Sequence, residues 1–359
     1  MSQQQLKLKF IDASGYVLSG KSAVLELLQE FDGYYTASRD CEFELLRMSG
    51  GLRDLEHALT NRWNPTSATL AISKFSKIVN ALGRSPKSYD LNGQFNSFAT
   101  KYDDRFHGKF TKISKVYIEK LIEFCIDSHT NTPYFFNTKT QYFLDRLMIK
   151  SKVKNMYKQQ EIKFTVLPEK FYKLTRDYLD QLFNVHNEFD TITKICGPTV
   201  KYERYNSFVL SNCCEPYNAS AGLNLFNNCK QIVVDRDPRD IYLFTKTEDP
   251  HSGLGHLGHS GEENIDTFIT RYRYLRERSE PFVGSDRMFI YFEDLVLNYH
   301  DSVARIIKFL GEDSSIHKHK KKFFDPEKSL SSVGLWKQNT YSADIAKIEN
   351  MLPEFCRDY

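Results

Sequence analysis

The hydrophobic and polar positions of this chain form two recurring patterns, short apolar runs and longer amphipathic stretches. Strands are predicted at residues 6–11, 33–37, 207–211, 231–235 and 287–292. Helical spacing is found at residues 23–31, 263–278 and 299–310. Strands that alternate with helices in this way are typical of an α/β fold with a parallel sheet flanked by helices on both faces.

The middle of the chain has a different character. Residues 51–100 are mixed and mostly helical, and residues 101–200 are polar and rich in helical patterns. We therefore expect one α/β domain over residues 1–359 with a helix-rich insertion at 101–200. Residues 101–175 contain 15 Lys and Arg against 8 Asp and Glu. This excess of positive charge is typical of a solvated helical face. It would also suit a lobe that attracts a negatively charged substrate, an anionic acceptor, to its side of the molecule.

A glycine-rich motif lies between the first predicted strand and the first predicted helix. Gly15, Gly20, Lys21 and Ser22 fit G-x-x-x-x-G-K-[ST] without a mismatch. The N–H groups of such a loop and of the following helix N-terminus can bind a phosphate-like group. The sequence therefore predicts a nucleotide site close to the N-terminus.

Composition narrows the class of protein. The chain has 359 residues with 41% hydrophobic content, and its net charge of +3 is too small to indicate nucleic-acid binding. No window approaches the length of a transmembrane helix, and no signal peptide is recognised at the start. The seven cysteines are scattered without a C-x-x-C pair, so neither a zinc site nor a disulfide framework is expected. We expect a cytoplasmic protein without a transmembrane segment.

Three later segments, together with the glycine loop, resemble a known family. They are QIVVDRDPRDIYL at 231–243, FIYFEDLVLNYHDSVARIIKFLG at 289–311 and SLSSVGLWKQ at 329–338. In this order they are similar to sulfotransferases that use 3′-phosphoadenosine-5′-phosphosulfate (PAPS), and especially to carbohydrate-type members with the P-loop fold. The resemblance covers about residues 6–46 and 205–359.

The resemblance implies a PAPS site without a metal. The 5′-phosphosulfate would bind Gly15, Ser19, Gly20, Lys21 and Ser22. The remainder of the nucleotide, including its 3′-phosphate, would bind Arg236, Ser331, Ser332, Trp336 and Lys337.

The chain departs from the family pattern at three places. Leu18 stands where the family usually has the lysine of its phosphosulfate loop, so Lys21 is expected to supply that charge. Phe244 stands where a serine often binds the 3′-phosphate, and Thr245 is only a weak substitute. The RKG of many cytosolic members is replaced by residues 329–331, SLS.

The general base is not decided by the sequence. Many cytosolic members use a histidine where this chain has Asn212, whereas carbohydrate-type members use a glutamate whose place corresponds to Glu42. Glu42 could instead cap a helix, and Glu44 is a close competitor for the catalytic role. His256 and His259, in the glycine-rich loop at 249–261, are a further possible source of the base.

The predicted activity is transfer of a sulfuryl group to a hydroxyl acceptor, either a carbohydrate or a sterol or lipid alcohol. Two alternatives remain open at this point. One is a P-loop ATP-dependent kinase, for which Asp235 at the end of an apolar strand would hold Mg²⁺. The other is a catalytically inactive nucleotide-binding or glycan-binding module.

Overall fold

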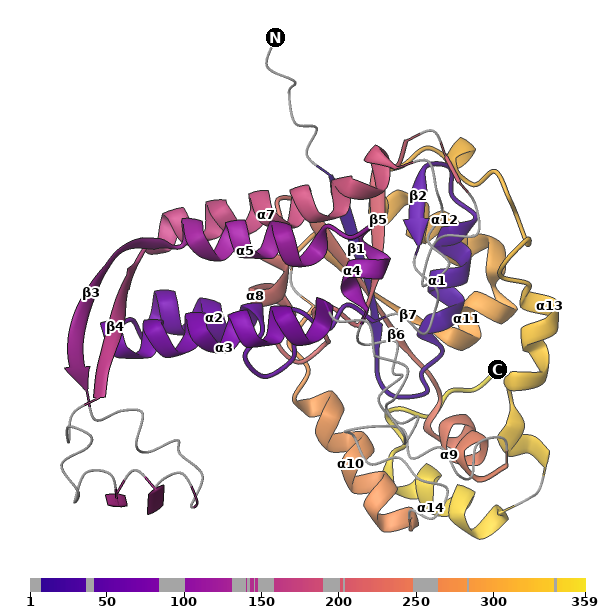
Figure 1. Ribbon diagram of the computed structural model, residues 1–359. Helices are drawn as coiled ribbons and strands as arrows, with labels where there is room; N and C mark the ends of the chain where they lie inside the picture. The colour runs from indigo at the N-terminus through magenta and orange to yellow at the C-terminus, as the bar shows by residue number, and fades with distance from the viewer. Residues whose placement is uncertain are drawn as a thin grey trace, which may run out of the picture.

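A five-stranded parallel sheet forms the centre of the molecule in the computed structural model (Figure 1). The model describes residues 8–36, 42–83, 101–130, 140, 143–144, 146–147, 158–189, 201–202, 204–247, 264–282, 284–338 and 341–359. The strand order is β2 (Tyr34–Thr36), β5 (Ser207–Ser211), β1 (Lys9–Gly15), β6 (Cys229–Asp235) and β7 (Arg287–Tyr291). All neighbouring strands are parallel, which confirms the predicted α/β class.

Strand β1 extends further than its apolar run predicted. It continues to Gly15, which pairs with Val234 of β6, and therefore includes the polar residues Asp12 and Ser14. Both side chains are buried, and the Asp12 carboxylate accepts N–H groups from Cys213 and Cys214. These hydrogen bonds offset the cost of burying the polar groups, so the strand reaches the first glycine of the motif.

Helices cover one face of the sheet closely. They are α1 (Lys21–Gln29), α11 (Phe292–Leu297) and α12 (Tyr299–Leu310). Their apolar side chains share a core with Ile11, Val209 and Ile232, which alternate along their strands with residues that point to the opposite face. Phe10 and Phe208 belong to that opposite face, where Phe10 contacts Phe183 at a ring-centroid distance of 5.3 Å.

A helical lobe packs on the second face and extends away from the sheet (Figure 1). Its helices are α2 (Leu52–Glu56), a π-helical turn (His57–Asn61), α3 (Pro65–Gly83), α4 (Tyr102–Arg105), α5 (Phe110–Lys120) and α7 (Pro168–Glu188). The lobe also contains an antiparallel strand pair, β3 (Ile122–Thr130) with β4 (Lys158–Thr165). The sequence analysis expected helices in this section and did not predict the strand pair, although Ile122, Phe124 and Ile126 recur at the period of a strand.

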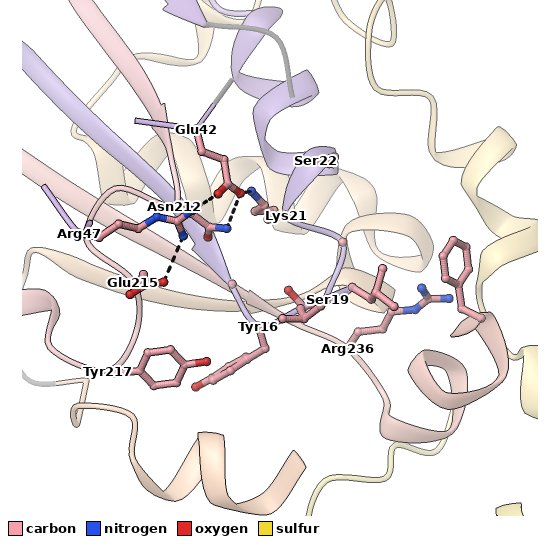
Figure 2. A pocket seen from close by; sticks show the side chains of 15 residues that line it. Tyr16, Ser19, Lys21, Ser22, Glu42, Arg47, Asn212, Glu215, Tyr217 and Arg236 are labelled. Atoms are coloured by element: carbon pink, nitrogen blue, oxygen red, sulfur yellow. Dashed lines mark hydrogen bonds and ion pairs between the residues drawn. The ribbon is translucent and has the colours of Figure 1, made fainter. Parts of the chain in front are cut away.

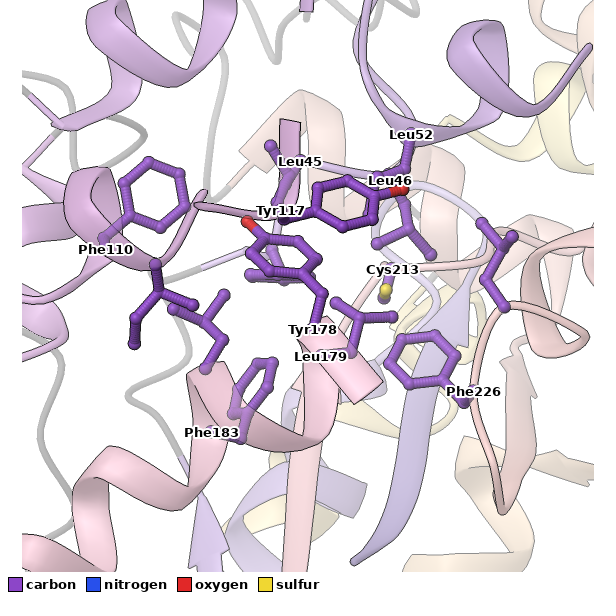
Figure 3. Packing of buried hydrophobic residues seen from close by; sticks show 14 of the residues in the cluster. Leu45, Leu46, Leu52, Phe110, Tyr117, Tyr178, Leu179, Phe183, Cys213 and Phe226 are labelled. Carbon is purple, nitrogen blue, oxygen red and sulfur yellow. The ribbon is translucent and has the colours of Figure 1, made fainter. Parts of the chain in front are cut away.

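The interior of the lobe anchors the segment that follows Glu42. Leu45 and Leu46 are buried in the same core as Tyr117 and Tyr178 (Figure 3). These two tyrosine rings stack at 4.4 Å. The lobe therefore holds a segment whose first described residue, Glu42, is a candidate catalytic group.

Three helices pack together after the end of β6, namely α9 (Pro238–Thr247), α10 (Ile265–Glu277) and α14 (Ser342–Met351). The other short elements are α8 (Ala219–Leu223), α13 (Pro326–Ser329) and the 3-10 turns Ser314–Ile316, Leu330–Ser332 and Leu335–Gln338. Helices α9, α10 and α14 share a small core around Phe268 and Ile348. Within the described residues, no helix has both the length and the apolar character needed to cross a membrane.

Candidate active site

The two glycines of the motif occupy positions where a Cβ atom would clash with neighbouring atoms. Gly15 ends β1, and a Cβ atom there would lie 2.7 Å from the Val234 carbonyl oxygen. Gly20 immediately precedes α1 and has φ +87°, where a Cβ atom would lie 2.6 Å from the Phe292 ring. Both positions therefore exclude larger residues, and the loop between them follows a tight path.

Polar groups of the loop are available for an anion. Gly20 provides no side-chain cap for α1, and the Ala23 N–H donates to the Gly20 carbonyl oxygen at 3.0 Å. The N–H groups of Lys21 and Ser22 at the start of the helix can therefore bind a ligand. The Ser19 hydroxyl is buried and has no hydrogen-bond partner among the described residues. Ser22 lies in the first turn of the helix and also lines the cavity in front of the loop. Such an arrangement fits a phosphate-like group.

Arg236 provides a second positively charged position. It follows β6 directly, is only 4% exposed, and lies between the rings of Phe244 and Phe292 at 5.5 and 5.1 Å (Figure 2). Its Nη2 donates to the Ser332 carbonyl oxygen, whereas its buried Nε has no partner within the described chain. Burial lowers the pKa of Arg236, although the charges of Asp240 and Glu293 oppose that shift.

One cavity joins these two positions. Its volume is about 490 Å³, and its wall includes the glycine loop from Gly15 to Ser22 as well as Arg236. This volume lies in the range of pockets that hold small ligands. Because the cavity is at the carboxyl ends of β1, β5 and β6, it occupies the edge where parallel α/β sheets bind ligands.

Glu42 lies in the same cavity and contacts the lysine of the loop (Figure 2). Its carboxylate accepts hydrogen bonds from Lys21 and from Asn212 Nδ2, the latter at 2.8 Å. Lys21 Nζ also donates to Ser211 Oγ at 2.9 Å. Burial alone would raise the pKa of Glu42, but the charges of Lys21 and Arg47 and the hydrogen bonds outweigh it and lower the pKa.

Arg47 is the common hydrogen-bond donor to three carboxylates at this end of the cavity. It donates to Glu42, to Glu44 at 2.6 and 2.9 Å, and to Glu215 at 3.1 Å. Glu42 and Glu215 line the cavity with Arg47, whereas Glu44 is absent from the wall that the described residues form. The geometry therefore favours Glu42 over Glu44 as the carboxylate that can reach a ligand.

Helix α4 of the lobe fixes the backbone of this segment. The Tyr102 hydroxyl donates to the Glu42 carbonyl oxygen at 3.3 Å and accepts the Glu44 N–H at 2.8 Å. Arg105 Nη1 is 3.4 Å from the same Glu42 carbonyl oxygen. The helical lobe thus positions the candidate base even though it contributes no residue of its own to the described cavity wall.

The late segment at 329–338 supports Arg236 and does not line the cavity. Ser332 contributes the carbonyl oxygen that Arg236 contacts. The Ser331 hydroxyl donates to the Lys328 carbonyl oxygen at 3.3 Å. The Trp336 ring stacks on the Arg239 guanidinium at 3.7 Å, and Lys337 donates to the Tyr359 carbonyl oxygen at 2.5 Å.

Asp240 fixes this late segment to α9. Its carboxylate accepts the Gly334 N–H at 2.8 Å, the Trp336 N–H at 3.3 Å and the Tyr359 hydroxyl at 2.9 Å. It therefore connects the late segment to the RDPRD sequence at residues 236–240. The predicted loop histidines, His256 and His259, lie outside the described residues.

Asp235, which could have held Mg²⁺ in a kinase, is already engaged. Its carboxylate accepts hydrogen bonds from Arg276, with one contact of 2.9 Å, and from the Arg236 N–H at 2.8 Å. The side chain is 3% exposed. No group of three or more metal-binding side chains is found in the described part of the chain.

Eight residues of the described cavity wall were not predicted from the sequence as site residues, namely Tyr16, Val17, Leu18, Arg47, Asn212, Glu215, Tyr217 and Phe244. Glu215 and Tyr217 follow the carboxyl end of β5, so their position after a predicted strand could have indicated them. No local signal identifies Arg47, because its partners come from distant parts of the chain.

Comparison with known proteins finds similar chains among solved structures. No protein-family model and no curated protein matches the sequence. Among solved structures, the chain is similar to the sulfotransferase domain of the curacin biosynthetic pathway, with 13% identity over 97% of each chain and a TM-score of 0.40. A sulfotransferase domain of the Synechococcus PCC 7002 olefin synthase matches with 13% identity, 98% and 95% coverage and a TM-score of 0.39.

Retinol dehydratase in a complex with retinol and PAP is also similar, with 12% identity, coverage of 98% of this chain and 82% of that one, and a TM-score of 0.33. At this identity and quality of superposition, the similarity does not determine an activity for this chain.

Proposed function

We propose that this protein is a PAPS-dependent sulfotransferase that acts on a hydroxyl acceptor, a carbohydrate in preference to a sterol or lipid alcohol. The observation that carries the proposal is one cavity with three chemical positions. The glycine loop with Lys21 provides one anion site, buried Arg236 provides another, and the Glu42 carboxylate lies beside Lys21.

The residues of the cavity fit the two charged ends of PAPS. The loop N–H groups, Lys21 and the unpartnered Ser19 hydroxyl would hold the 5′-phosphosulfate. Arg236, which has an unpartnered buried Nε, would bind the 3′-phosphate. PAPS supplies the activated sulfuryl group, whose bond to the 5′-phosphate breaks during transfer.

Glu42 and Lys21 have complementary tasks in this proposal. Glu42 takes the proton of the acceptor hydroxyl, and its lowered pKa keeps it ionised at neutral pH. Lys21 offsets the negative charge that develops on the 5′-phosphate as the sulfuryl group leaves. Sulfuryl transfer resembles phosphoryl transfer, in which positioning and charge provide most of the catalysis.

A P-loop kinase is the second candidate, because Lys21 and Ser22 complete a Walker-type loop. However, the Asp235 carboxylate is paired with Arg276 in a buried position, so the usual acidic ligand of Mg²⁺ is not free. A catalytically inactive binding module would have the same cavity but would transfer neither a sulfuryl nor a phosphoryl group.

Transfer assays distinguish these candidates. The protein is incubated with ³⁵S-labelled PAPS, or with γ-labelled ATP and Mg²⁺, against panels of sugars, sterols and phenols. We expect sulfuryl transfer that Glu42→Gln reduces at least about 100-fold while the affinity for adenosine 3′,5′-bisphosphate stays within about twofold of wild type, because the amide retains the shape and polarity of the side chain.

Lys115→Ala, on the exposed side of α5, is the control for Lys21→Ala. The control should retain activity, and Lys21→Ala should lose it. Phosphoryl transfer from ATP without any sulfuryl transfer would contradict the proposal. Full activity of Glu42→Gln would remove this residue as the base.

A further inference from the structure

The cavity continues past Lys21, away from Arg236, into a part that we call the acceptor end. It is formed by Glu42, Arg47, Asn212, Glu215 and Tyr217 (Figure 2). Figure 2 shows these side chains to the left of Lys21 and Arg236 to its right. If Lys21 and Arg236 bind the two charged groups of PAPS, the acceptor end is where the second substrate must approach.

The acceptor end carries an excess of negative charge among the described residues. Its own cation, Arg47, is shared by the carboxylates of Glu42, Glu44 and Glu215. Lys21 borders the acceptor end and also pairs with Glu42, but the proposed function assigns its charge to the 5′-phosphosulfate. Burial alone would lower the pKa of Arg47, but the hydrogen bonds to Glu44 and the charges of the three carboxylates raise it. The guanidinium is thus saturated by protein carboxylates and is not free to bind an anionic acceptor.

Two residues of the acceptor end have polar atoms without a hydrogen-bond partner among the described residues. Asn212 donates its amide N–H to Glu42, whereas its Oδ1 atom is buried and has no partner in the described chain. The Tyr217 hydroxyl is likewise buried without a partner there. Since Oδ1 can only accept, a ligand that satisfies it must present an N–H or O–H donor.

Two aromatic rings line the same part of the cavity. Tyr16 and Tyr217 have ring centroids 6.2 Å apart at an interplanar angle of 67°. Burial raises the pKa of Tyr217 to about 12, so its phenol stays neutral and adds no charge at physiological pH. Aromatic rings beside carboxylates suit a ring-shaped ligand with polar donors at its edge.

From these contacts, and resting on the proposed sulfuryl transfer, we infer that the acceptor is a ring alcohol that carries no negative charge and presents an amine or another hydrogen-bond donor to Glu215 and Asn212. The positive charge of residues 101–175 does not change this inference, because none of the described residues in that range lines the cavity. A uronate or a sulfated glycan unit would instead meet the carboxylates of Glu42 and Glu215, and the two neighbouring cations, Arg47 and Lys21, are already paired with protein carboxylates.

Two charge series of small acceptors test the inference. One comprises methyl glucoside, glucosamine and glucuronate, and the other tyrosol, tyramine and 4-hydroxyphenylacetate. For each compound we measure kcat/KM with PAPS and, separately, calorimetric binding to protein saturated with adenosine 3′,5′-bisphosphate. The amine should exceed the acid by about tenfold or more in both measurements, because unscreened like charges repel in a partly buried cavity.

Glu215→Gln should reduce the preference for the amine to less than about threefold, since it removes one of the repelling charges. Glu119→Gln, on the exposed face of α5, is the matched control and should leave the preference unchanged.

The outcomes separate the two proposals. Equal or better use of the acids in either series overturns the inference and leaves sulfuryl transfer intact. Amine-selective binding that depends on Glu215, without turnover, supports the inference and contradicts the transferase. A lack of detectable binding by every neutral and cationic compound counts against the inference.

Discussion

Replacing Arg236 with methionine separates the role of its guanidinium in binding from its role in the fold. In the free protein this buried group has a hydrogen bond to the Ser332 carbonyl oxygen and two aromatic neighbours. No carboxylate of the described residues lies within ion-pair distance of it, and its Nε has no partner. Methionine can fill the space between Phe244 and Phe292 without burying a charge.

The substitution should change the free energy of unfolding much less than the free energy of ligand binding. Loss of the Ser332 hydrogen bond costs about 1 kcal/mol of unfolding free energy, and relief of the buried charge offsets a similar amount. The stability of the free protein should therefore change by less than about 1 kcal/mol. Loss of two charge-assisted hydrogen bonds to a 3′-phosphate should weaken ligand binding by about 3 kcal/mol, or about 100-fold in Kd.

Thermal unfolding with and without adenosine 3′,5′-bisphosphate measures both effects. At a concentration of about 100 times the wild-type Kd, the ligand stabilises the wild type by about 2.7 kcal/mol and the variant by about 0.4 kcal/mol. For a chain of this length, these values correspond to Tm shifts of about 4 °C and about 0.5 °C. A variant that unfolds much earlier but keeps the full ligand-induced shift would refute a binding role for Arg236.

Three further predictions concern pH and backbone shape. Arg47→Met should move the acid limb of the kcat/KM profile to higher pH, because the positive charge of Arg47 helps to lower the pKa of Glu42. Gly20→Ala should lower the unfolding free energy, measured in urea, by more than Gly311→Ala, which should cost about 1 kcal/mol. Both glycines have positive φ, but only at Gly20 would the added Cβ meet a neighbouring side chain. Glu293→Gln should raise the free energy of unfolding above that of the wild type at pH 8, and should do so less at pH 5. The reason is that burial raises the pKa of Glu293 to about 7, so the wild-type side chain is charged only at the higher pH.

The sign of the Glu293 effect follows from proton binding. The folded protein binds this proton more firmly than the unfolded chain, whose glutamate has a pKa of about 4.3. The ionised side chain therefore destabilises the fold progressively as pH rises through the interval up to about 7. Equal stability of wild type and Glu293→Gln at pH 8 would contradict this reasoning, as would an unmoved acid limb in Arg47→Met or equal losses in the two glycine variants.

The elements that pack on the sheet were largely predictable from the sequence. Strand β5 and helix α12 have the predicted bounds, because a continuous apolar run and a regular amphipathic pattern reflect their buried positions directly. The end of β1 was not predictable, because the burial of Asp12 depends on N–H groups from residues 213 and 214. Strands β3 and β4 were missed although Ile122, Phe124 and Ile126 in β3 and Ile162 and Phe164 in β4 alternate with polar residues, because these short runs lie in a long polar section dominated by helical patterns.

The candidate site was predictable where it follows a motif and less so where it depends on tertiary contacts. The glycine loop and Arg236 line one cavity, as their places after two neighbouring strands indicated. The choice between Glu42 and Glu44 needed the structure, since Arg47 contacts both and only Glu42 reaches the cavity. The roles of the individual residues stay predictions until the variants are measured.

Calorimetric titration with adenosine 3′,5′-bisphosphate in the presence of EDTA tests the central claim most directly. The claim is that the glycine loop and Arg236 bind the two phosphate ends of one adenosine nucleotide without a metal. The account predicts one-to-one binding that Lys21→Ala and Arg236→Met each weaken by at least about tenfold. Binding of ATP with Mg²⁺ and no binding of the bisphosphate, or bisphosphate binding that neither variant affects, would contradict it.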